Sequence, residues 1–489
     1  MLLKVKSLEL LTGKFVAILH ERTARSLAVY AGERIRIKNK HSIVAILDTA
    51  KGILKEDEIA LSVEVMNALN IKEGDKVRIS IEPPSKVSTY ILEKLRGKTL
   101  DYSKLLAIVG DIVHNTLTEV EIAYFISGTY IHGMSDNEIS DLTKAMVFFG
   151  KKLNLTGKIY DKHSISGVAG NRTTPLIISI CSSAGVVMPK TSSRAITSAA
   201  GTADVIESLA KVEFSVDEIK KIIRNTNACM VWGGAIGLAP ADDKIIQVER
   251  IISLDPEAQL IASILAKKLA VGAKGVLLDI PYGKSAKVRT KSDAEKLGRR
   301  FQKISSLLKL NVKTVVTDGS QPIGNGIGPV LEAIDVIKVL KQSKDRPLDL
   351  EKKAVFLSGI LLEIAGKAKT GKGIYLAQEI LKSGRALKKF KEIISAQGGS
   401  ADKKLSPADL SFIIKASKPG KIKEIDSKKI ALVAKGAGCP ADKIAGLFLH
   451  VHLNDIIKKS DKLLTIYAET EEKLKFAKDI YEQIKPIVY

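Results

Sequence analysis

The spacing of the apolar residues changes along the chain, and this change limits what each part can fold into. Up to about residue 84, short runs such as K-V-K-S-L-E-L, F-V-A-I-L and R-I-R-I are separated by glycines and charged turns. Short segments with apolar residues at alternate positions are typical of strands that bury one face. The sequence therefore predicts a small N-terminal β domain, a compact barrel, over residues 1–84, with Pro83 and Pro84 at its end.

The next part of the chain has a helical period. Apolar residues recur three and four positions apart, Thr118 with Glu121 fits a capping box, and Gly133 fits a helix end. The same period returns further along the chain. We therefore predict a helical domain that is discontinuous in sequence and consists of residues 86–150 and 239–270.

Strand-like runs then alternate with helical ones. G-K-I-Y-D, G-V-V-M-P-K, G-V-L-L-D-I and T-V-V-T-D have helical segments between them, which favours an α/β layer with a mainly parallel sheet over residues 155–235 and 271–415. K-I-A-L-V-A-K and L-F-L-H-V-H-L are interpreted as strands, and a helix is expected from about Glu471, so residues 416–489 predict a C-terminal α/β lobe. The predicted fold class is a multidomain α/β protein.

The charge of the chain favours anionic partners. Lysine and arginine number 77 against 54 aspartates and glutamates, so the formal net charge is +23. The excess is mostly scattered lysine rather than a dense arginine stripe with aromatic residues between. We therefore interpret it chiefly as solvated helix faces, with nucleic-acid binding as an alternative.

The cysteines favour a reducing compartment. Cys181, Cys229 and Cys439 are far apart and lack C-x-x-C spacing, so neither a disulfide framework nor a zinc site is predicted. A cytoplasmic location fits this pattern. The longest uncharged stretch, residues 173–189, is interrupted by proline, glycine and serines, so neither a membrane span nor a signal peptide is expected.

One loop has the chemistry of a phosphate site. D-K-H-S-I-S-G-V-A-G-N-R-T-T, residues 161–174, follows a predicted strand that ends at Asp161. Gly167 and Gly170 allow backbone N–H groups to approach an anion, and a helix expected to begin near Thr174 adds its positive end. The side chains available to the anion are Lys162, Ser164, Thr173 and Thr174. A purely structural turn is the alternative interpretation.

A second hydroxyl-rich loop, T-S-S-R-A-I-T-S-A-A-G-T-A-D, covers residues 191–204. Arg194 offers a forked donor for an oxyanion, and Gly201 allows close approach. The hydroxyl side chains are Ser192, Ser193, Thr197, Ser198 and Thr202. Two such loops on neighbouring strands would place two anion sites at one edge of the sheet. The alternative is that the hydroxyls cap a helix and that Arg194 forms a surface ion pair.

Two further segments carry candidate ligand side chains. Asp255 stands just before a proline, which fits either a helix N-cap or a functional carboxylate. Ser263 and Lys267 follow on one face of the expected helix. The turn P-Y-G-K-S-A-K-V supplies Lys284 and Lys287, for which an exposed turn lysine is the alternative.

The sequence does not carry the common cofactor motifs. Of the seven histidines, only His163 lies in a candidate site, and no H-x-x-x-H, H-E-x-x-H or H-x-x-E-H pair occurs. The P-loop pattern G-x-x-x-x-G-K-[ST] does not occur, and no G-x-G-x-x-G opens a helix, which disfavours ATPase and dinucleotide-binding functions. We therefore expect neither a catalytic metal nor an organic cofactor.

Several motifs, in order, resemble the thymidine/pyrimidine-nucleoside phosphorylase family over residues 86–489. They are N-E-I-S-D-L-T-K-A-M, D-K-H-S-I-S-G-V, S-S-R-A-I-T-S-A-A-G-T-A-D and L-I-A-S-I-L-A-K-K. V-W-G-G-A-I-G-L-A-P-A-D-D, L-D-P-E-A-Q and the extra N-terminal domain are similar to the archaeal branch that acts on AMP. The resemblance implies phosphorolysis. Inorganic phosphate, as co-substrate, would attack C1′ of a nucleoside 5′-monophosphate such as AMP, CMP or UMP and release the free base and ribose 1,5-bisphosphate.

The resemblance also implies roles for individual residues. The attacking phosphate would be bound by Lys162, Ser164, Thr174 and Ser192, with Thr202 shared with the nucleotide. The nucleotide would be bound by Gly167, Ser193, Arg194, Ala195, Ile196, Thr197, Ser198, Thr202, Ser263 and Lys287. Asp255 would donate a proton to the departing base, a contribution of about 10²- to 10⁴-fold. For that role it must stay protonated at neutral pH, through burial or nearby anions.

Two positions depart from the family pattern, and both lie in the first loop. Ser166 stands where members usually have the first of two glycines, and Ala169 stands where the branch often has proline. Ser166 would either restrict the backbone or supply another hydroxyl.

The partners implied by the resemblance are the nucleotide, phosphate and further copies of the chain. A homodimeric core is expected, with a larger homo-oligomer assembled through the N-terminal domain, and without nucleic-acid or membrane partners. Two alternative functions remain. One is a nucleoside phosphorylase that does not require a 5′-phosphate, and the other is a nucleic-acid-binding protein that uses the positive charge.

Overall fold

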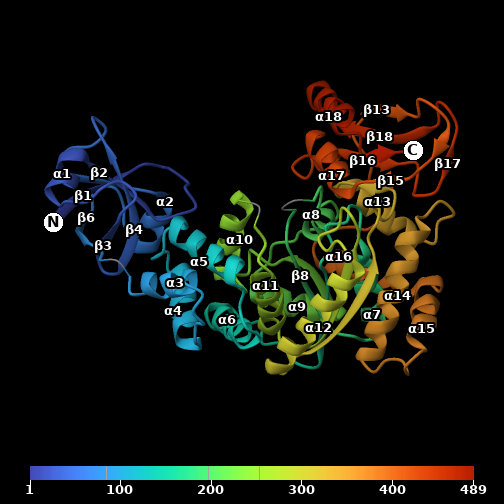
Figure 1. Cartoon of the computed structure of the whole chain (residues 1–489), viewed down its shortest axis with the longest axis horizontal. Helices are drawn as coiled ribbons and strands as arrows, with labels where there is room; N and C mark the ends of the chain where they lie inside the picture. The colour runs from blue at the N-terminus through green and yellow to red at the C-terminus, as the bar shows by residue number, and fades with distance from the viewer. Residues whose placement is uncertain (84, 196–197, 253) are drawn as a thin grey trace. The chain divides into compact units, whose positions relative to one another are not determined.

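The computed structural model describes residues 1–83, 85–195, 198–252 and 254–489. The chain divides into two compact units. The first contains Met1–Phe149 and Pro240–Ser263, and the second contains Gly150–Ala239 and Ile264–Tyr489 (Figure 1). Each unit is therefore built from segments that are distant in the sequence.

The first unit begins with a closed β-barrel, as the alternating N-terminal segments predict. Its strands follow the order β1-β5-β2-β4-β3-β6. The bounds of the strands and of the two short helices between them are β1 Leu2–Ser7, β2 Val16–His20, α1 Glu21–Ser26, β3 Arg34–Lys38, β4 Ser42–Ala50, β5 Glu58–Leu61, α2 Val63–Leu69 and β6 Lys76–Ile81. Alternate side chains such as Leu19, Ile37 and Val77 are fully buried inside the barrel.

A helical bundle completes the first unit. Its helices are α3 Val87–Leu95, α4 Tyr102–Val113, α5 Glu119–His132, α6 Asp136–Phe149 and α10 Pro240–Ile252. The predicted capping box is confirmed, because Thr118 Oγ1 accepts the Glu121 N–H and the Glu121 carboxylate accepts the Thr118 N–H. Gly133 ends α5 with a φ of 65°, a backbone conformation that glycine adopts readily. Helix α10 comes much later in the sequence, yet it packs on α4 and α5.

Helix α11, Glu257–Ala270, belongs to both units. The first unit ends at Ser263 and the second resumes at Ile264, which differs from the predicted helical block of residues 239–270. The end of α11 joins the second unit because Lys268 pairs with Asp161 at 2.6 Å, and because the Ala270 carbonyl accepts the Leu153 N–H.

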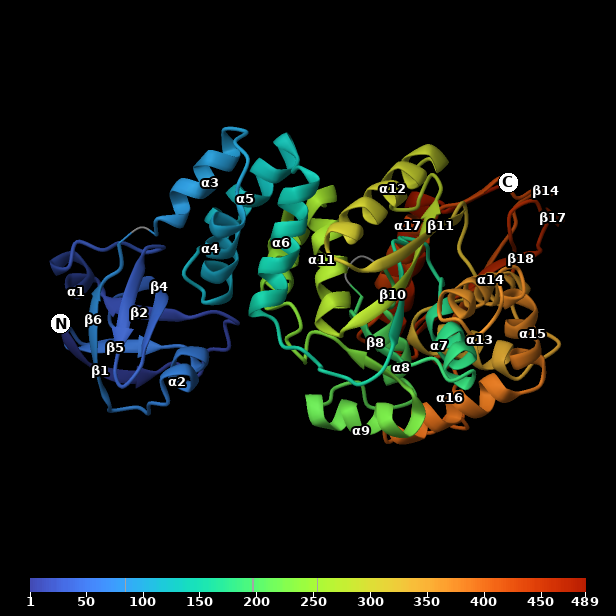
Figure 2. The same cartoon turned by 90° about the horizontal axis from the view of Figure 1, so that it is seen from below.

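Parallel strands form the sheets at the start of the second unit, in agreement with the α/β prediction (Figure 2). The strands β11 Asn311–Asp318, β10 Ala273–Tyr282 and β7 Ile159–Ser164 form one sheet in that order, and β8 Met188–Ser192 pairs with β9 Ala228–Trp232. A parallel bridge between Ile159 and Val187 connects the two sheets. The prediction that the strand ends at Asp161 is wrong, because β7 continues to pair with β10 as far as Ser164 and Asp279.

The helices of this α/β region include one buried helix, α7, on which four others pack. Their bounds are α7 Thr173–Ser183, α8 Thr202–Glu207, α9 Val216–Thr226, α12 Lys291–Leu307, α13 Pro329–Leu340, α14 Leu348–Ile364, α15 Gly373–Lys382 and α16 Arg385–Ala396. Every residue of α7 from Thr173 to Ser182 is buried, and α13, α14, α15 and α16 pack on it. The apolar core therefore fixes the start of α7, which is also the end of the first candidate loop.

The C-terminal part of the second unit is an α/β lobe. Its elements are β12 Gly326–Ile327, β13 Leu410–Lys415, β14 Gly420–Lys421, β15 Glu424–Ile425, α17 Ser427–Gly436, β16 Gly446–Leu449, β17 Ile456–Ile457, β18 Lys462–Ala468, α18 Glu471–Ile484 and β19 Ile487–Val488. The strand prediction for K-I-A-L-V-A-K is wrong, because this run lies in α17. Asp426 caps the helix by accepting the N–H groups of Lys428 and Lys429, and Ile430 and Val433 face the core.

The three cysteines are free thiols in the interior of the second unit. Cys181, Cys229 and Cys439 are all buried. Burial raises the pKa of each thiol above its usual value. They therefore contribute packing volume to the fold rather than cross-links.

We predict that a buried ion pair in the bundle contributes strongly to stability. Lys94 Nζ lies 2.9 Å from Glu138 Oε1, and both side chains are almost completely buried. Lys94→Met would leave a buried carboxylate without its cation, and we expect a loss of about 3–5 kcal/mol in the free energy of unfolding, measured by urea titration. Lys144→Met, which removes the exposed pair with Asp141, is the control and should cost less than about 1 kcal/mol. Equal losses would contradict the prediction.

Candidate functional site

A buried carboxylate anchors the strand before the first loop. Asp161 lies inside β7, 1% exposed, and its two oxygens face the ammonium groups of Lys190 at 3.4 Å and Lys268 at 2.6 Å. Burial alone would raise the pKa of Asp161, but the two lysines outweigh it and lower that pKa below its usual value. Asp161 is therefore an ionised structural group rather than a free ligand for an anion.

Lys162 places an ammonium group at the start of the loop. Its side chain is buried, and Nζ donates to Thr173 Oγ1 at 3.0 Å, in the first turn of α7. Burial lowers the pKa of Lys162 to about 8, with Asp279 opposing the shift and Lys353 and Arg172 adding to it. A buried cation surrounded by other cations is stabilised when an anion binds beside it.

The glycines of the first loop are required by close contacts as well as by backbone conformation. Gly167 and Gly170 have φ values of 62° and 67°. A Cβ atom on Gly167 would lie 2.8 Å from the Lys287 nitrogen, and one on Gly170 would lie 2.3 Å from the Ile323 oxygen. The first loop therefore lies directly against the 281–288 turn, whose Lys287 N–H donates to the Ser166 carbonyl at 3.3 Å.

The Ser166 side chain is used within the loop. Its Oγ accepts the Val168 N–H at 3.0 Å and the Asn171 Nδ2–H at 2.9 Å. Ser166, which departs from the family pattern, therefore supplies a hydroxyl group that forms hydrogen bonds within the turn. Asn171 also approaches Ser164, with Nδ2 at 3.4 Å from Ser164 Oγ.

The Ser164 hydroxyl donates to a carboxylate that lies outside the predicted site residues. Ser164 Oγ donates to Asp279 Oδ2 at 2.7 Å, and Thr317 Oγ1 donates to Asp279 Oδ1 at 2.6 Å. Lys353 Nζ, on α14, lies 3.4 Å from the same Asp279 Oδ2. A signal was present in the sequence, since Asp279 is the one charged residue of the run G-V-L-L-D-I.

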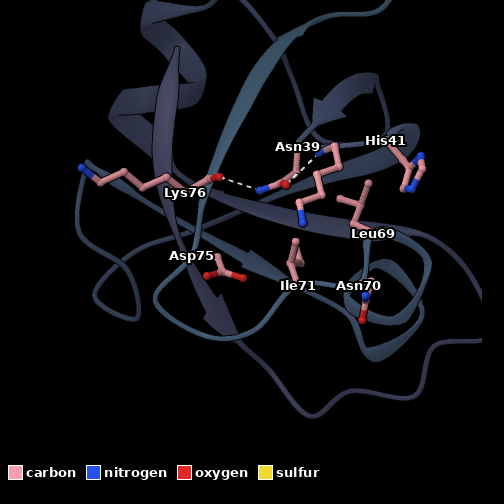
Figure 3. A pocket seen from close by; sticks show the side chains of 8 residues that line it. Asn39, His41, Leu69, Asn70, Ile71, Asp75 and Lys76 are labelled. Atoms are coloured by element: carbon pink, nitrogen blue, oxygen red, sulfur yellow. Dashed lines mark hydrogen bonds between the residues drawn. The ribbon is translucent and has the colours of Figure 1, made fainter.

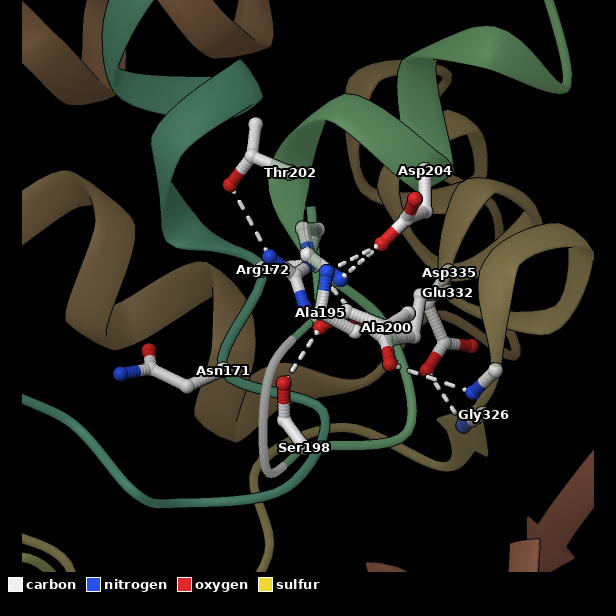
Figure 4. Close-up of polar contacts among 12 residues, drawn as sticks. Asn171, Arg172, Ala195, Ser198, Ala200, Thr202, Asp204, Gly326, Glu332 and Asp335 are labelled. Atoms are coloured by element: carbon white, nitrogen blue, oxygen red, sulfur yellow. Dashed lines mark hydrogen bonds and ion pairs between the residues drawn. The ribbon is translucent and has the colours of Figure 1, made fainter. Parts of the chain in front are cut away.

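Arg172 joins the first loop to the second. Its Nε forms an ion pair with Glu332 Oε2 at 2.5 Å, NH1 donates to Thr202 Oγ1 at 2.9 Å, and NH2 donates to the Ala200 carbonyl at 2.9 Å (Figure 4). Burial raises the pKa of Glu332 above its usual value, although Arg172 opposes the shift. The guanidinium thus brings together the two loops that the sequence predicted as neighbours, a role that the motifs around Arg172 did not indicate.

Asp204 shapes the second loop. Its Oδ2 accepts the N–H groups of Ala195 and Gly201, each at 2.7 Å (Figure 4). Ser198 Oγ donates to the Ala200 carbonyl at 3.0 Å, and Ser192 Oγ donates to the Val231 carbonyl at 3.3 Å. Ser193 is exposed. The predicted ligands Ile196 and Thr197 lie outside the described residues.

Arg194 has carboxylate partners, as the surface ion-pair alternative proposed. Its guanidinium pairs with Glu207 at 2.7 Å, Glu213 at 3.1 Å and Asp204 at 3.4 Å, and it lies over the Trp232 ring. An oxyanion would have to compete with these groups for its donors. The structure therefore does not present Arg194 as an open anion ligand.

The remaining predicted residues occupy four places. Thr174 is buried at the first turn of α7, and Lys287 is exposed on the turn beside Gly167. Asp255 is exposed between α10 and α11, and Ser263 is half-buried within α11. Asp255 and Ser263 belong to the first unit, whereas Lys162, Ser164 and Thr202 belong to the second. The burial that was considered for Asp255 is thus not observed.

Other features of the described residues add no further candidate for the same chemistry. A pocket of about 290 Å³ on the barrel is lined by Asn39, Lys40, His41, Leu69, Asn70, Ile71, Asp75 and Lys76, and contains none of the predicted residues (Figure 3). Within the described ranges, no group of three or more His, Cys, Asp or Glu side chains is arranged to hold a metal ion. Among the helices that the structure describes, none has the length and apolar character that a bilayer crossing requires.

Three family models match successive parts of the chain. A "Glycosyl transferase family, helical bundle domain" matches residues 88–150, and a "Glycosyl transferase family, a/b domain" matches residues 156–387. A "Pyrimidine nucleoside phosphorylase C-terminal domain" matches residues 421–486. These boundaries follow the bundle, the α/β region and the C-terminal lobe.

Curated relatives match almost the whole chain. AMP phosphorylase of Methanococcus vannielii is 40% identical and covers 99% of this chain and 97% of the relative. AMP phosphorylase of Methanococcoides burtonii is 42% identical and covers 100% of this chain and 97% of the relative. A putative thymidine phosphorylase of Legionella pneumophila is 42% identical over 92% of this chain and 87% of the relative.

A solved structure shares the fold. Anthranilate phosphoribosyltransferase from Thermus thermophilus superposes with a TM-score of 0.53 at 16% identity, over 63% of this chain and 99% of that one. At this identity the match supports the helical bundle and α/β architecture, and nothing about substrate.

The lowered pKa of Lys162 predicts how anion binding depends on pH. Because burial lowers the pKa of this lysine to about 8, its ammonium form is present below that pH and is lost above it. We expect the affinity for phosphate, measured by titration calorimetry, to fall roughly tenfold or more between about pH 8 and pH 9.5. Lys162→Arg stays charged over this range, so its affinity should remain level. A constant wild-type affinity up to about pH 9.5 would contradict the assignment.

Proposed function

The chain belongs to the AMP phosphorylase branch of the thymidine/pyrimidine-nucleoside phosphorylase family, and we propose that it converts nucleoside 5′-monophosphates and phosphate to free base and ribose 1,5-bisphosphate. It is an enzyme of the pentosyltransferase type. AMP is the expected first substrate, with CMP and UMP as further ones. The reaction would serve nucleotide salvage and degradation.

The observation that supports this proposal most directly is the junction made by Arg172. It holds two hydroxyl-rich loops together in one compact unit, each at the end of a parallel strand. Ligands of α/β proteins bind at this end of the strands. The proposed reaction involves two phosphate groups, the one that attacks and the one on the nucleotide, so two adjoining anion-binding loops fit its chemistry.

We assign the attacking phosphate to the first loop. Lys162 supplies a buried positive charge, and the first turn of α7, with Thr173 and Thr174, supplies the positive end of a buried helix. Ser164 and Ser192 complete this proposed site. The nucleotide would lie against the second loop, with Thr202 at the junction.

Asp255 is the proposed acid. Breakage of the bond at C1′ places negative charge on the departing base, and a proton donated by Asp255 would neutralise it. Ser263, two turns into the following helix, would contact the nucleotide.

The wider setting follows from the same proposal. The scheme uses no resident cofactor, since phosphate itself is the nucleophile. We also propose a cytoplasmic enzyme, in keeping with its free thiols, and a homodimeric core that assembles further through the N-terminal barrel. Neither nucleic acid nor a membrane is a partner in this scheme.

A panel of substrates tests the proposed function. Phosphate-dependent release of base should be fast with AMP, CMP or UMP and at least about tenfold slower with adenosine, cytidine or thymidine, because the parent nucleosides lack the charge-assisted contacts of the 5′-phosphate. The second candidate is a nucleoside phosphorylase, which the similarity to the Legionella protein favours. Faster release from the nucleosides would establish that alternative.

Removal of the acid should affect turnover more than binding. For Asp255→Asn we expect kcat with AMP to fall by about 10²- to 10⁴-fold while AMP still binds in calorimetry. Glu257→Gln, at a neighbouring exposed carboxylate, is the control and should retain most of the wild-type kcat. Near-normal turnover of Asp255→Asn would remove this residue from the acid role.

A further inference from the structure

The hydrogen-bond pattern around Ser164 restricts the form of phosphate that the first loop can accept. This inference rests on the proposed function. Ser164 has one hydroxyl hydrogen, and it is donated to Asp279 Oδ2 at 2.7 Å. An ionised carboxylate only accepts hydrogen bonds, so the direction of this bond is fixed. Ser164 Oγ can then offer a ligand a lone pair but no hydrogen.

Asp279 is held in its ionised form. Its side chain is completely buried, and Thr317 donates to its other oxygen at 2.6 Å. Lys353 Nζ lies 3.4 Å from Asp279 Oδ2, so its positive charge stabilises the ionised carboxylate. Burial alone would raise the pKa of Asp279, but Lys353 and Lys162 outweigh it and lower that pKa.

The side-chain oxygen of Asn171, beside Ser164, lacks a donor. Asn171 points its Nδ2 toward Ser166 Oγ at 2.9 Å and Ser164 Oγ at 3.4 Å, and its side chain extends away from the Arg172 network (Figure 4). Its Oδ1 is buried and has no hydrogen-bond partner within the described ranges. A buried acceptor without a donor is costly, and a ligand that brings a hydrogen would relieve it.

We propose that this cradle, formed by Ser164, Asn171 and Asp279, selects a tetrahedral oxyanion that still carries a proton. Hydrogenphosphate would donate its P–OH hydrogen to Ser164 Oγ, next to the unpaired Asn171 Oδ1, while Lys162 and the start of α7 receive its negative oxygens. Sulfate has nearly the same size and the same charge as hydrogenphosphate, but it has no proton at neutral pH. Its oxygen would face the Ser164 lone pair, and Asn171 Oδ1 would stay without a donor. Asp279 is thus a specificity-determining residue that acts through the Ser164 hydroxyl.

The selection is measured with simple anions and the full-length chain. Phosphate, arsenate and sulfate are titrated calorimetrically at neutral pH and constant ionic strength. Arsenate retains a proton as phosphate does, so both should bind, whereas sulfate should bind about 10- to 100-fold more weakly, the cost of leaving a buried acceptor unpaired. Equal affinity of the wild-type chain for sulfate and phosphate would overturn the inference.

Asp279→Asn should reverse the direction of the critical bond. Because Thr317 donates to one oxygen of residue 279, the new amide keeps its oxygen there and turns its NH₂ group toward Ser164. The Ser164 hydrogen is then available to the ligand, and the phosphate-to-sulfate ratio should fall to within a few-fold of one. Thr317→Val loses a bond to the same carboxylate but leaves the Ser164 bond in place, so it is the matched control and should keep the wild-type ratio. An unchanged ratio in Asp279→Asn would overturn the inference.

Two further measurements make the outcome decisive. If Asp279→Asn does not fold, Ser164→Ala removes the acceptor directly, and the phosphate advantage should shrink in the same way; a retained advantage would overturn the inference. Release of adenine from AMP is assayed on the same preparations. A chain that prefers phosphate but releases no base would contradict the proposed function alone, whereas one that releases base without any preference would contradict this inference alone.

Discussion

The ion cluster at Asp161 is the interaction on which the rest of the second unit depends. Its carboxylate lies in β7, and its two lysine partners come from β8 and from the end of α11. Displacement of any one of these three elements would leave a buried charge without its partner, which costs several kcal/mol of stability. The next residue, Lys162, begins the first loop. The cluster therefore also fixes where the buried ammonium group of that loop points.

The two candidate loops are bonded internally before any ligand arrives. Ser166 accepts a hydrogen bond within the first loop, and Asp204 accepts two N–H groups of the second loop. Arg172 connects the two loops. Such loops lose little conformational freedom when a ligand binds, which favours affinity and precise placement. The same order has a chemical cost, since hydroxyl groups already committed as donors, such as Ser164, can meet a ligand only as acceptors.

The sequence predicted those features that depend on local pattern. The barrel, the capping box at Thr118, and the strand–loop–helix context of both loops follow from periodicity and from glycine and hydroxyl placement. The partners that are distant in the sequence could not be predicted from local pattern. Arg194 is paired by carboxylates 13 and 19 residues away, and Lys353 is one of two adjacent lysines of which only the fold brings one to Asp279. The apolar residues of the run K-I-A-L-V-A-K fit either a strand or a helix. The carboxylate of Asp426 before the run favours the helix, because it caps the first turn.

The buried thiols have a practical consequence for spectroscopy. Thiol-reactive probes attack the exposed thiolate form, and in this fold Cys181, Cys229 and Cys439 are neither exposed nor readily ionised. The folded chain thus behaves toward maleimide dyes and spin labels as if it had no cysteine. A cysteine introduced at an exposed position can be labelled selectively in the native background. With two such cysteines, the distance between the chosen sites becomes measurable in solution without first removing the natural thiols.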